Sequence, residues 1–261
     1  MQEHEPAPQP PPGPKRRGAL GTLAATAAVI GAKFAIIVKL LASSWTFILS
    51  LGLYAAFFGW RIAIVLIFVL AAHELGHYYA YRAYGLAARL PVFVPFLGAF
   101  TAGAIAPDLE TDAYIALAGP IVGLGLAAVC YGAGLLTNDR FWFACADISA
   151  FLNLFNMLPV LPFDGGRVIG AVWPPLWIAG IALFVGASLW LHVPIIFVAI
   201  IALLGLPSML ATFRGRVDPR AAAMTLAARV RVGTWYAMTL IALAVVLGES
   251  QHALPVQQGI L

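Results

Sequence analysis

The stretch 62–81, IAIVLIFVLAAHELGHYYAY, decides what kind of fold this chain has. It is apolar over the ~20 residues that a helix needs to cross a bilayer. It nevertheless contains His73, Glu74 and His77, and ionisable side chains in a membrane helix are costly, so they mark a functional site. On a helix the two histidines lie at i and i+4, on one face. Such a pair can hold a zinc ion, with Glu74 beside it as a general base.

The composition of the rest of the chain also indicates a membrane protein. Hydrophobic residues make up 62% of the 261 residues and charged residues 10%, whereas globular chains are about half apolar and a quarter charged. The net charge is only +4, and the arginines gather at the ends of apolar segments, which is typical of membrane topology. We therefore expect the lipid bilayer as a partner and no nucleic acid. Cys130 and Cys145 lie in apolar segments, where cysteine usually acts as a small hydrophobe.

Seven apolar segments are candidate membrane spans. The predicted fold class is an all-α polytopic membrane protein with a six-span core, a seventh span and a re-entrant extended or β segment near 90–103. The spans are expected at 43–60, 62–81, 114–137, 141–158, 168–191, 194–212 and 232–248. Pro174-Pro175 is expected to break the first part of the fifth span.

The chain divides into five regions by composition. We expect a disordered proline-rich arm at 1–18, an interfacial helix at 19–42, a core at 43–212, a basic cytoplasmic loop at 213–231, and a C-terminal span and tail at 232–261. A membrane-spanning helix at 19–41 remains an alternative. Nearly all the arginine clusters fall on one side of the membrane if the N-terminus is cytoplasmic. The basic loop is a topology signal or, alternatively, a site for a regulator or an anionic lipid.

The segment 90–103, LPVFVPFLGAFTAG, is apolar but contains two prolines and two glycines, which disfavour a helix. Extended backbone at membrane depth must be buried in protein or line a cavity. The segment is therefore either a packed re-entrant loop or a strand whose free edge receives an extended substrate. In the second case Phe93, Val94 and Phe96 are candidate substrate-binding residues.

A third metal ligand is expected at Asp164, in the stretch 153–167, NLFNMLPVLPFDGGR. Zinc hydrolases usually supply three protein ligands. By the predicted topology Asp164 ends an apolar run at the cytoplasmic end of the fourth span, at a depth similar to that of His73 and His77, and Gly165-Gly166 allows a tight turn there. Alternatively, Asp164 caps the helix that follows. Asn153 and Asn156, at i and i+3, either form interhelical hydrogen bonds or contact a substrate.

The pairing of HELGH with NLFNMLPVLPFDGGR resembles the site-2 protease family of intramembrane zinc metalloproteases. Members of that family have H-E-x-x-H on one span and an N-x-x-P-x-x-x-x-D-G type motif on a later span, whose Asp is a zinc ligand. Asn156, Pro159, Asp164 and Gly165 occupy the matching positions here, and Gly119-Pro120 matches a further motif. The chain is similar to minimal bacterial members with a segment like 95–100, PFLGAF, and it has room for neither a PDZ insertion nor a CBS domain.

The resemblance implies a metalloendopeptidase in the bacterial inner membrane that cleaves membrane-spanning segments of other proteins. Zinc on His73, His77 and Asp164 would lower the pKa of a water molecule, and Glu74 would act as the catalytic base. Two alternatives use the same residues: a membrane metal-ion transporter and a non-catalytic scaffold. The presence of Glu74 and the lack of a visible inverted repeat count against transport, and the intact set of ligands and base counts against a scaffold.

Overall fold

The computed structural model describes residues 45–95, 98–190, 192–216 and 218–254. The predicted arm at 1–18, the predicted interfacial helix at 19–42 and Phe96 lie outside these ranges. The chain forms two units, Met1–Trp45 and Thr46–Leu261, and the description that follows concerns the second unit.

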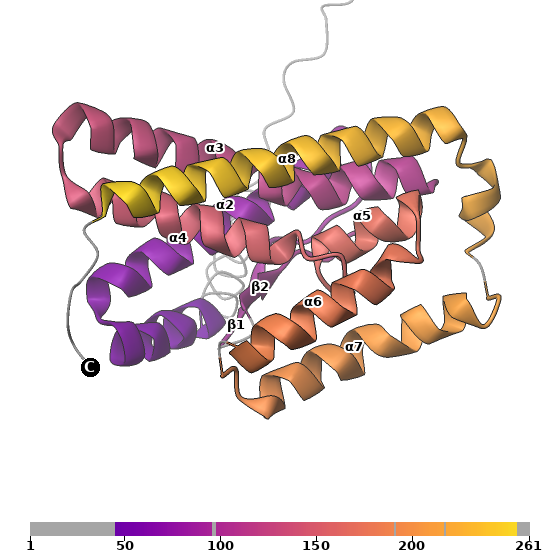
Figure 1. Ribbon diagram of the computed structural model, residues 1–261, viewed down its shortest axis with the longest axis horizontal. Helices are drawn as coiled ribbons and strands as arrows, with labels where there is room; N and C mark the ends of the chain where they lie inside the picture. Colours follow the sequence, from indigo (N-terminus) through magenta and orange to yellow (C-terminus); the bar gives the residue numbers. More distant parts are fainter. Residues whose placement is uncertain (1–44, 96–97, 191, 217, 255–261) are drawn as a thin grey trace, which may run out of the picture. The chain divides into compact units, whose positions relative to one another are not determined.

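Helices make up most of the described chain, as the sequence predicts (Figure 1). They are a first helix Trp45–Phe58, then α2 Trp60–Ala83, α3 Leu109–Thr137, α4 Arg140–Asn156, α5 Asp164–Val172, α6 Leu176–Trp190, α7 Ile195–Phe213, the short 3₁₀ helix η1 Pro219–Ala223, and α8 Leu226–Ala253.

Three of the described helices, α2, α3 and α8, are long and apolar enough to cross a membrane. They correspond to the second, third and seventh predicted spans. The helices at the other predicted spans are shorter. α6, for example, has 15 residues, which corresponds to about 22 Å at 1.5 Å per residue, less than the ~30 Å of a typical hydrocarbon core.

Two predicted boundaries differ from the structure. The break expected at Pro174-Pro175 in the fifth span is confirmed, since α5 and α6 are separate helices, but α5 already begins at Asp164 instead of residue 168. The basic loop predicted at 213–231 ends early, because Thr225 caps α8 by accepting from the Ala228 amide. Arg229 and Arg231 therefore lie on a helix.

The proline-containing segment after α2 forms an antiparallel β-hairpin of β1, Val92–Val94, and β2, Gly98–Phe100. A separate, isolated bridge joins Ala88 to Gly103. The predicted strand is thus present, and the segment returns on itself instead of continuing as a single strand.

A buried apolar core joins α3, α4, α5 and α8. In Figure 1, α8 runs across α3 and α4. Leu117 and Val232 are fully buried in this core. Small residues bring helices close together elsewhere: a Cβ at Gly76 of α2 would lie 2.6 Å from the Ala118 carbonyl oxygen of α3. Glycine at such a contact allows the two backbones to approach. This close pairing of α2 and α3 sets the environment of the histidines.

Candidate functional site

The three polar residues of the HELGH motif are buried on α2. His73, Glu74 and His77 have exposed fractions of 4%, 6% and 5%. Polar groups buried to this degree need partners, and the partners of the two histidines come from α3, α4 and α5.

His73 is oriented by a chain of hydrogen bonds from α4. The Asn153 side-chain amide nitrogen donates to the Ser149 carbonyl at 2.8 Å, which turns its Oδ1 toward His73. His73 Nδ1 donates to this oxygen at 2.8 Å. Ser149 Oγ in turn donates to the Gly123 carbonyl of α3 at 2.9 Å. Because Nδ1 carries the proton in the neutral ring, Nε2 has a free lone pair.

His77 is oriented by the backbone of α3. Its Nδ1 donates to the Ile115 carbonyl at 2.8 Å, so its Nε2 also has a free lone pair. Gly119 makes room for both rings: a Cβ there would overlap His77 Nε2 and would lie 2.9 Å from His73 Nε2. Gly119 therefore faces the two imidazoles directly.

Asp164 reaches the histidines from the first position of α5. The turn at 157–163 packs directly against the first turn of this helix. A Cβ at Gly165 or Gly166 would overlap the backbone at Met157 or Val160 respectively. The predicted alternative, in which Asp164 caps this helix, is wrong: the N-cap residue is Phe163, and no side chain caps the helix. The carboxylate points to the histidines instead.

Three atoms converge at this point. His73 Nε2 and His77 Nε2 are 3.0 Å apart, and Asp164 Oδ2 lies 3.1 Å from the first and 3.2 Å from the second. Two nitrogen lone pairs and a carboxylate oxygen are all acceptors, so a cation is needed between them. In tetrahedral zinc sites with bonds of 2.0–2.1 Å, ligand atoms lie about 3.3 Å apart. The triangle is close to that size, and these residues could hold a metal ion.

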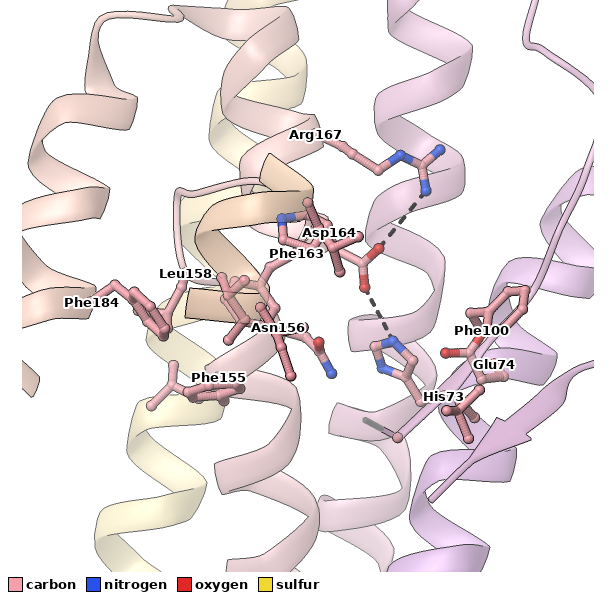
Figure 2. A pocket seen from close by; sticks show the side chains of 18 of the residues that line it. His73, Glu74, Phe100, Phe155, Asn156, Leu158, Phe163, Asp164, Arg167 and Phe184 are labelled. Carbon is pink, nitrogen blue, oxygen red and sulfur yellow. Dashed lines mark ion pairs between the residues drawn. The ribbon is translucent and has the colours of Figure 1, made fainter. Parts of the chain in front are cut away.

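The second oxygen of Asp164 faces Arg167, one helical turn further along α5. Figure 2 shows Asp164 between His73 and Arg167, with both ion pairs dashed. Arg167 Nη1 lies 3.8 Å from Asp164 Oδ1, and its Nη2 donates to Asp112 Oδ1 of α3 at 2.8 Å. In the sequence Arg167 stands out only as one of the arginines at the ends of apolar segments, although its spacing from Asp164 places the two on one helix face.

A cavity of about 850 Å³ opens beside the triangle. His73, Glu74, His77 and Asp164 lie in its wall, β2 forms one side, and α6 and α7 form another. Most of the remaining lining is apolar, including the rings of Phe100, Phe155, Phe163 and Phe184 that Figure 2 labels. A cavity that is mainly apolar with a few convergent polar groups is typical of a binding site.

The structure separates the residues predicted to contact a substrate. Val94 and Asn156 line the cavity. Phe93 is buried on the other face of β1, where its ring packs edge-on against Phe47 at 5.2 Å. Asn153 is fully buried against His73, which corresponds to the interhelical hydrogen bond left open by the sequence. A substrate contact stays a prediction for each of them.

Several residues that build the site are not recognisable from the sequence. Besides Arg167, these are Ser149, the Ile115 carbonyl, and Thr101, whose hydroxyl donates to the Glu74 carbonyl at 3.0 Å. Backbone carbonyls leave no signal in a sequence, and Thr101 is recognisable only once the hairpin places it beside α2.

Comparison with known proteins agrees with this geometry. Residues 61–139 match the model of Peptidase family M50. The chain is similar to zinc metalloprotease MJ0392 of Methanocaldococcus jannaschii, with 28% identity over 124 residues that cover 43% of this chain and 34% of that protein. It is also similar to the predicted zinc metalloprotease Rip3 of Mycobacterium tuberculosis, with 30% identity over 162 residues that cover 55% of this chain and 40% of that protein.

The chain thus spans between a third and two fifths of the length of these relatives. Among solved structures, the site-2 protease of Methanocaldococcus jannaschii superposes with a TM-score of 0.41 and 17% identity, covering 85% of this chain and 92% of that one. The family and sequence matches confirm the resemblance to site-2 proteases that the two motifs indicate.

Proposed function

We propose that this chain is an intramembrane zinc metalloendopeptidase that hydrolyses peptide bonds within or near the transmembrane segments of other proteins. The observation that carries the proposal is the triangle of His73 Nε2, His77 Nε2 and Asp164 Oδ2, three acceptors within 3.0–3.2 Å of one another. Glu74 in the same cavity wall supplies the base that hydrolysis needs and a simple metal carrier does not.

The residues have separate roles in the proposed reaction. His73, His77 and Asp164 would hold the zinc ion, which when bound would supply Lewis acidity for the scissile carbonyl and for water. Glu74 takes a proton from the attacking water and later donates it to the leaving amine nitrogen. Asn153 and the Ile115 carbonyl hold the Nδ1 protons of the two histidines, which keeps both Nε2 atoms free to bind the metal.

The β-hairpin is the proposed docking place for the substrate. A peptide bond in a helix is shielded by its own hydrogen bonds, so a substrate segment must unwind before it is cut. Gly98, Ala99, Phe100 and Thr101 line the cavity. An unwound segment that pairs with the free edge of β2 would place its backbone next to Glu74, as in other cases of strand addition.

The cellular location of the protein and the division of its chain into regions are also part of the proposal. We place the protein in a bacterial inner membrane with a cytoplasmic N-terminus, because the arginine clusters then share the cytoplasmic side. The catalytic core is 43–212, with the arm and interfacial helix before it and the α8 region after it. The substrates are membrane proteins with at least one transmembrane segment.

Purification in detergent tests the proposal through two separate readouts, bound zinc and cleavage of model transmembrane substrates. Wild type should bind about one zinc ion per chain and cut. Glu74→Gln should retain zinc and lose cleavage, because the amide cannot accept the proton. Asp164→Ala should lose most of the zinc. Normal cleavage by Glu74→Gln would falsify the mechanism, and full zinc content in Asp164→Ala would exclude Asp164 as a required ligand.

A further inference from the structure

Arg167 connects two carboxylates that lie on different helices. Its Nη2 donates to Asp112 Oδ1 in the first turn of α3 at 2.8 Å. Its Nη1 lies 3.8 Å from Oδ1 of Asp164, beyond hydrogen-bond length but within ion-pair distance. All three side chains are largely shielded, with exposed fractions of 27% for Arg167, 24% for Asp112 and 12% for Asp164.

The end of this linkage at Asp112 lies in the capped first turn of α3. Asp112 follows the N-cap Asp108, whose carboxylate accepts from the Thr111 amide at 2.7 Å, so the start of α3 is well ordered. Arg167 therefore has its partner in the capped first turn of α3. Its guanidinium is planar and presents its donors in a rigid fork, so anchoring one nitrogen also sets the position of the other.

The position of the guanidinium matters because a carboxylate has two equivalent oxygens. Rotation about the last torsion of an aspartate is broad and roughly two-fold. In this site Oδ2 faces both histidines and Oδ1 faces the positive charge of Arg167. Attraction of Oδ1 to Arg167 holds the carboxylate so that a single oxygen completes the triangle.

We infer that Arg167, held by Asp112, is a positioning residue that keeps Asp164 oriented to bind the metal through one oxygen. The inference rests on the proposed function, because it concerns the same metal centre. Groups that orient a metal ligand from behind typically contribute about 10–100-fold to metal affinity. Removing either Arg167 or Asp112 should therefore weaken metal binding even though neither touches the metal.

The chain offers matched controls for both residues. Arg231 on α8 pairs with Glu110, in the same first turn of α3, at 2.7 Å, but neither contacts the triangle. The test compares Arg167→Gln with Arg231→Gln, which both remove a positive charge, and Asp112→Asn with Glu110→Gln, which both remove a negative charge. Zinc affinity is measured by competition with a chelator, and the absorption spectrum of the cobalt(II)-loaded protein reports the ligand geometry.

We expect Arg167→Gln and Asp112→Asn each to weaken zinc binding about 10–100-fold and to change the cobalt spectrum at saturating metal. Arg167→Lys should lie between wild type and Arg167→Gln. The double variant should be little weaker than either single variant, because the two residues act as one unit. Both control variants should match wild type. In Arg167→Gln and Asp112→Asn, kcat should fall more than KM rises.

The outcomes separate this inference from the proposed function. If wild type binds zinc and cleaves while Arg167→Gln keeps wild-type zinc affinity and cobalt spectrum, the positioning role is overturned and the protease proposal stands. An equal loss of affinity in the Arg231→Gln control would also overturn it, since general electrostatics would then explain the effect. Failure of wild type itself to bind zinc or cleave would remove the proposed function and this inference together. A variant that is merely less stable would leave the cobalt spectrum of its folded, loaded form unchanged, and that result too counts against positioning.

Discussion

At the scale of single residues, the site depends on which nitrogen of each imidazole carries the proton. Asn153 and the Ile115 carbonyl both accept from Nδ1, so both Nε2 atoms remain free. Asn153 is the only one of these two acceptors that a substitution can remove, because the other is backbone. Substitution of Asn153 therefore tests whether the hydrogen bond to His73 Nδ1 supports metal binding.

Asn153→Ala should weaken zinc binding by about 10–100-fold, because His73 loses the acceptor that fixes its ring and tautomer. Asn156→Ala is the matched variant: Asn156 lies one turn away and lines the cavity, and its side chain donates to the Leu152 carbonyl of its own helix. It should keep wild-type zinc affinity. Chelator competition on both proteins checks the pair, and equal affinities for the two variants would contradict the role of Asn153.

Gly119→Ala should remove metal binding, because the new Cβ would overlap His77 Nε2 and crowd His73 Nε2, the two nitrogen atoms that are to bind the ion. Gly125→Ala, on the same helix, is the control, since a Cβ there meets nothing within 4 Å. We expect at least about a tenfold loss of zinc affinity in the first variant, as for a displaced ligand, and none in the second. Bound zinc after dialysis distinguishes them, and retention of zinc by Gly119→Ala would show that α3 can move aside.

At the scale of elements, α5 is a nine-residue helix that depends on its neighbours for its position. Isolated helices of this length are unstable in water. Its first turn is held by the close glycine contacts and by Trp177, whose indole N–H donates to the Gly166 carbonyl at 2.8 Å. Its last turn is held by α8: Arg229 Nη1 donates to the carbonyls of Ala171 and Val172 at 2.9 and 2.8 Å.

Arg229→Gln should destabilise the fold by about 1.5–3 kcal/mol, the range for hydrogen bonds to a charged group, because the two carbonyls at the end of α5 lose their donor. Thr234→Val is the control on α8, since Thr234 is exposed and donates only to the Val230 carbonyl of its own helix. Denaturant titration in mild detergent measures the difference. Equal midpoints for Arg229→Gln and Thr234→Val would mean that α8 does not support α5 through Arg229.

The sequence allowed prediction of those features that depend on local pattern. The HELGH motif, the candidate third ligand Asp164 and the extended character of 90–103 follow from helix periodicity, proline content and the resemblance, and the structure brings His73, His77 and Asp164 together. Pro174-Pro175 predicted the break in the first part of the fifth span, and the structure confirms it. The start of α5 at Asp164 and the start of α8 at Leu226 were missed, because an apolar run does not mark the residue at which a helix begins. The role of Phe93 on the core side of β1 depends on strand register, which a segment with two prolines does not specify.

At the scale of the whole molecule, the site joins residues that only the folded chain brings together. His77 and Asp164 are 87 positions apart and belong to α2 and α5. The unfolded chain lacks this arrangement, so a metal that binds the triangle binds the folded state far better. Binding must then appear as stability: at a free metal concentration of 100 times Kd, the free energy of unfolding rises by about 2.7 kcal/mol.

Zinc should therefore raise the unfolding midpoint of wild type and, to the same extent, that of Glu74→Gln, which keeps all three ligands. Asp164→Ala should show little rise at the same zinc concentration, because the triangle has lost the only ligand supplied by α5. Magnesium, which prefers oxygen ligands, is the control ion and should stabilise none of the three proteins. Unfolding in mild detergent with and without a zinc-specific chelator checks the effect and its reversal. A rise of equal size in Asp164→Ala would place the bound zinc elsewhere, since the loss of one of three ligands cannot leave the affinity of this site unchanged.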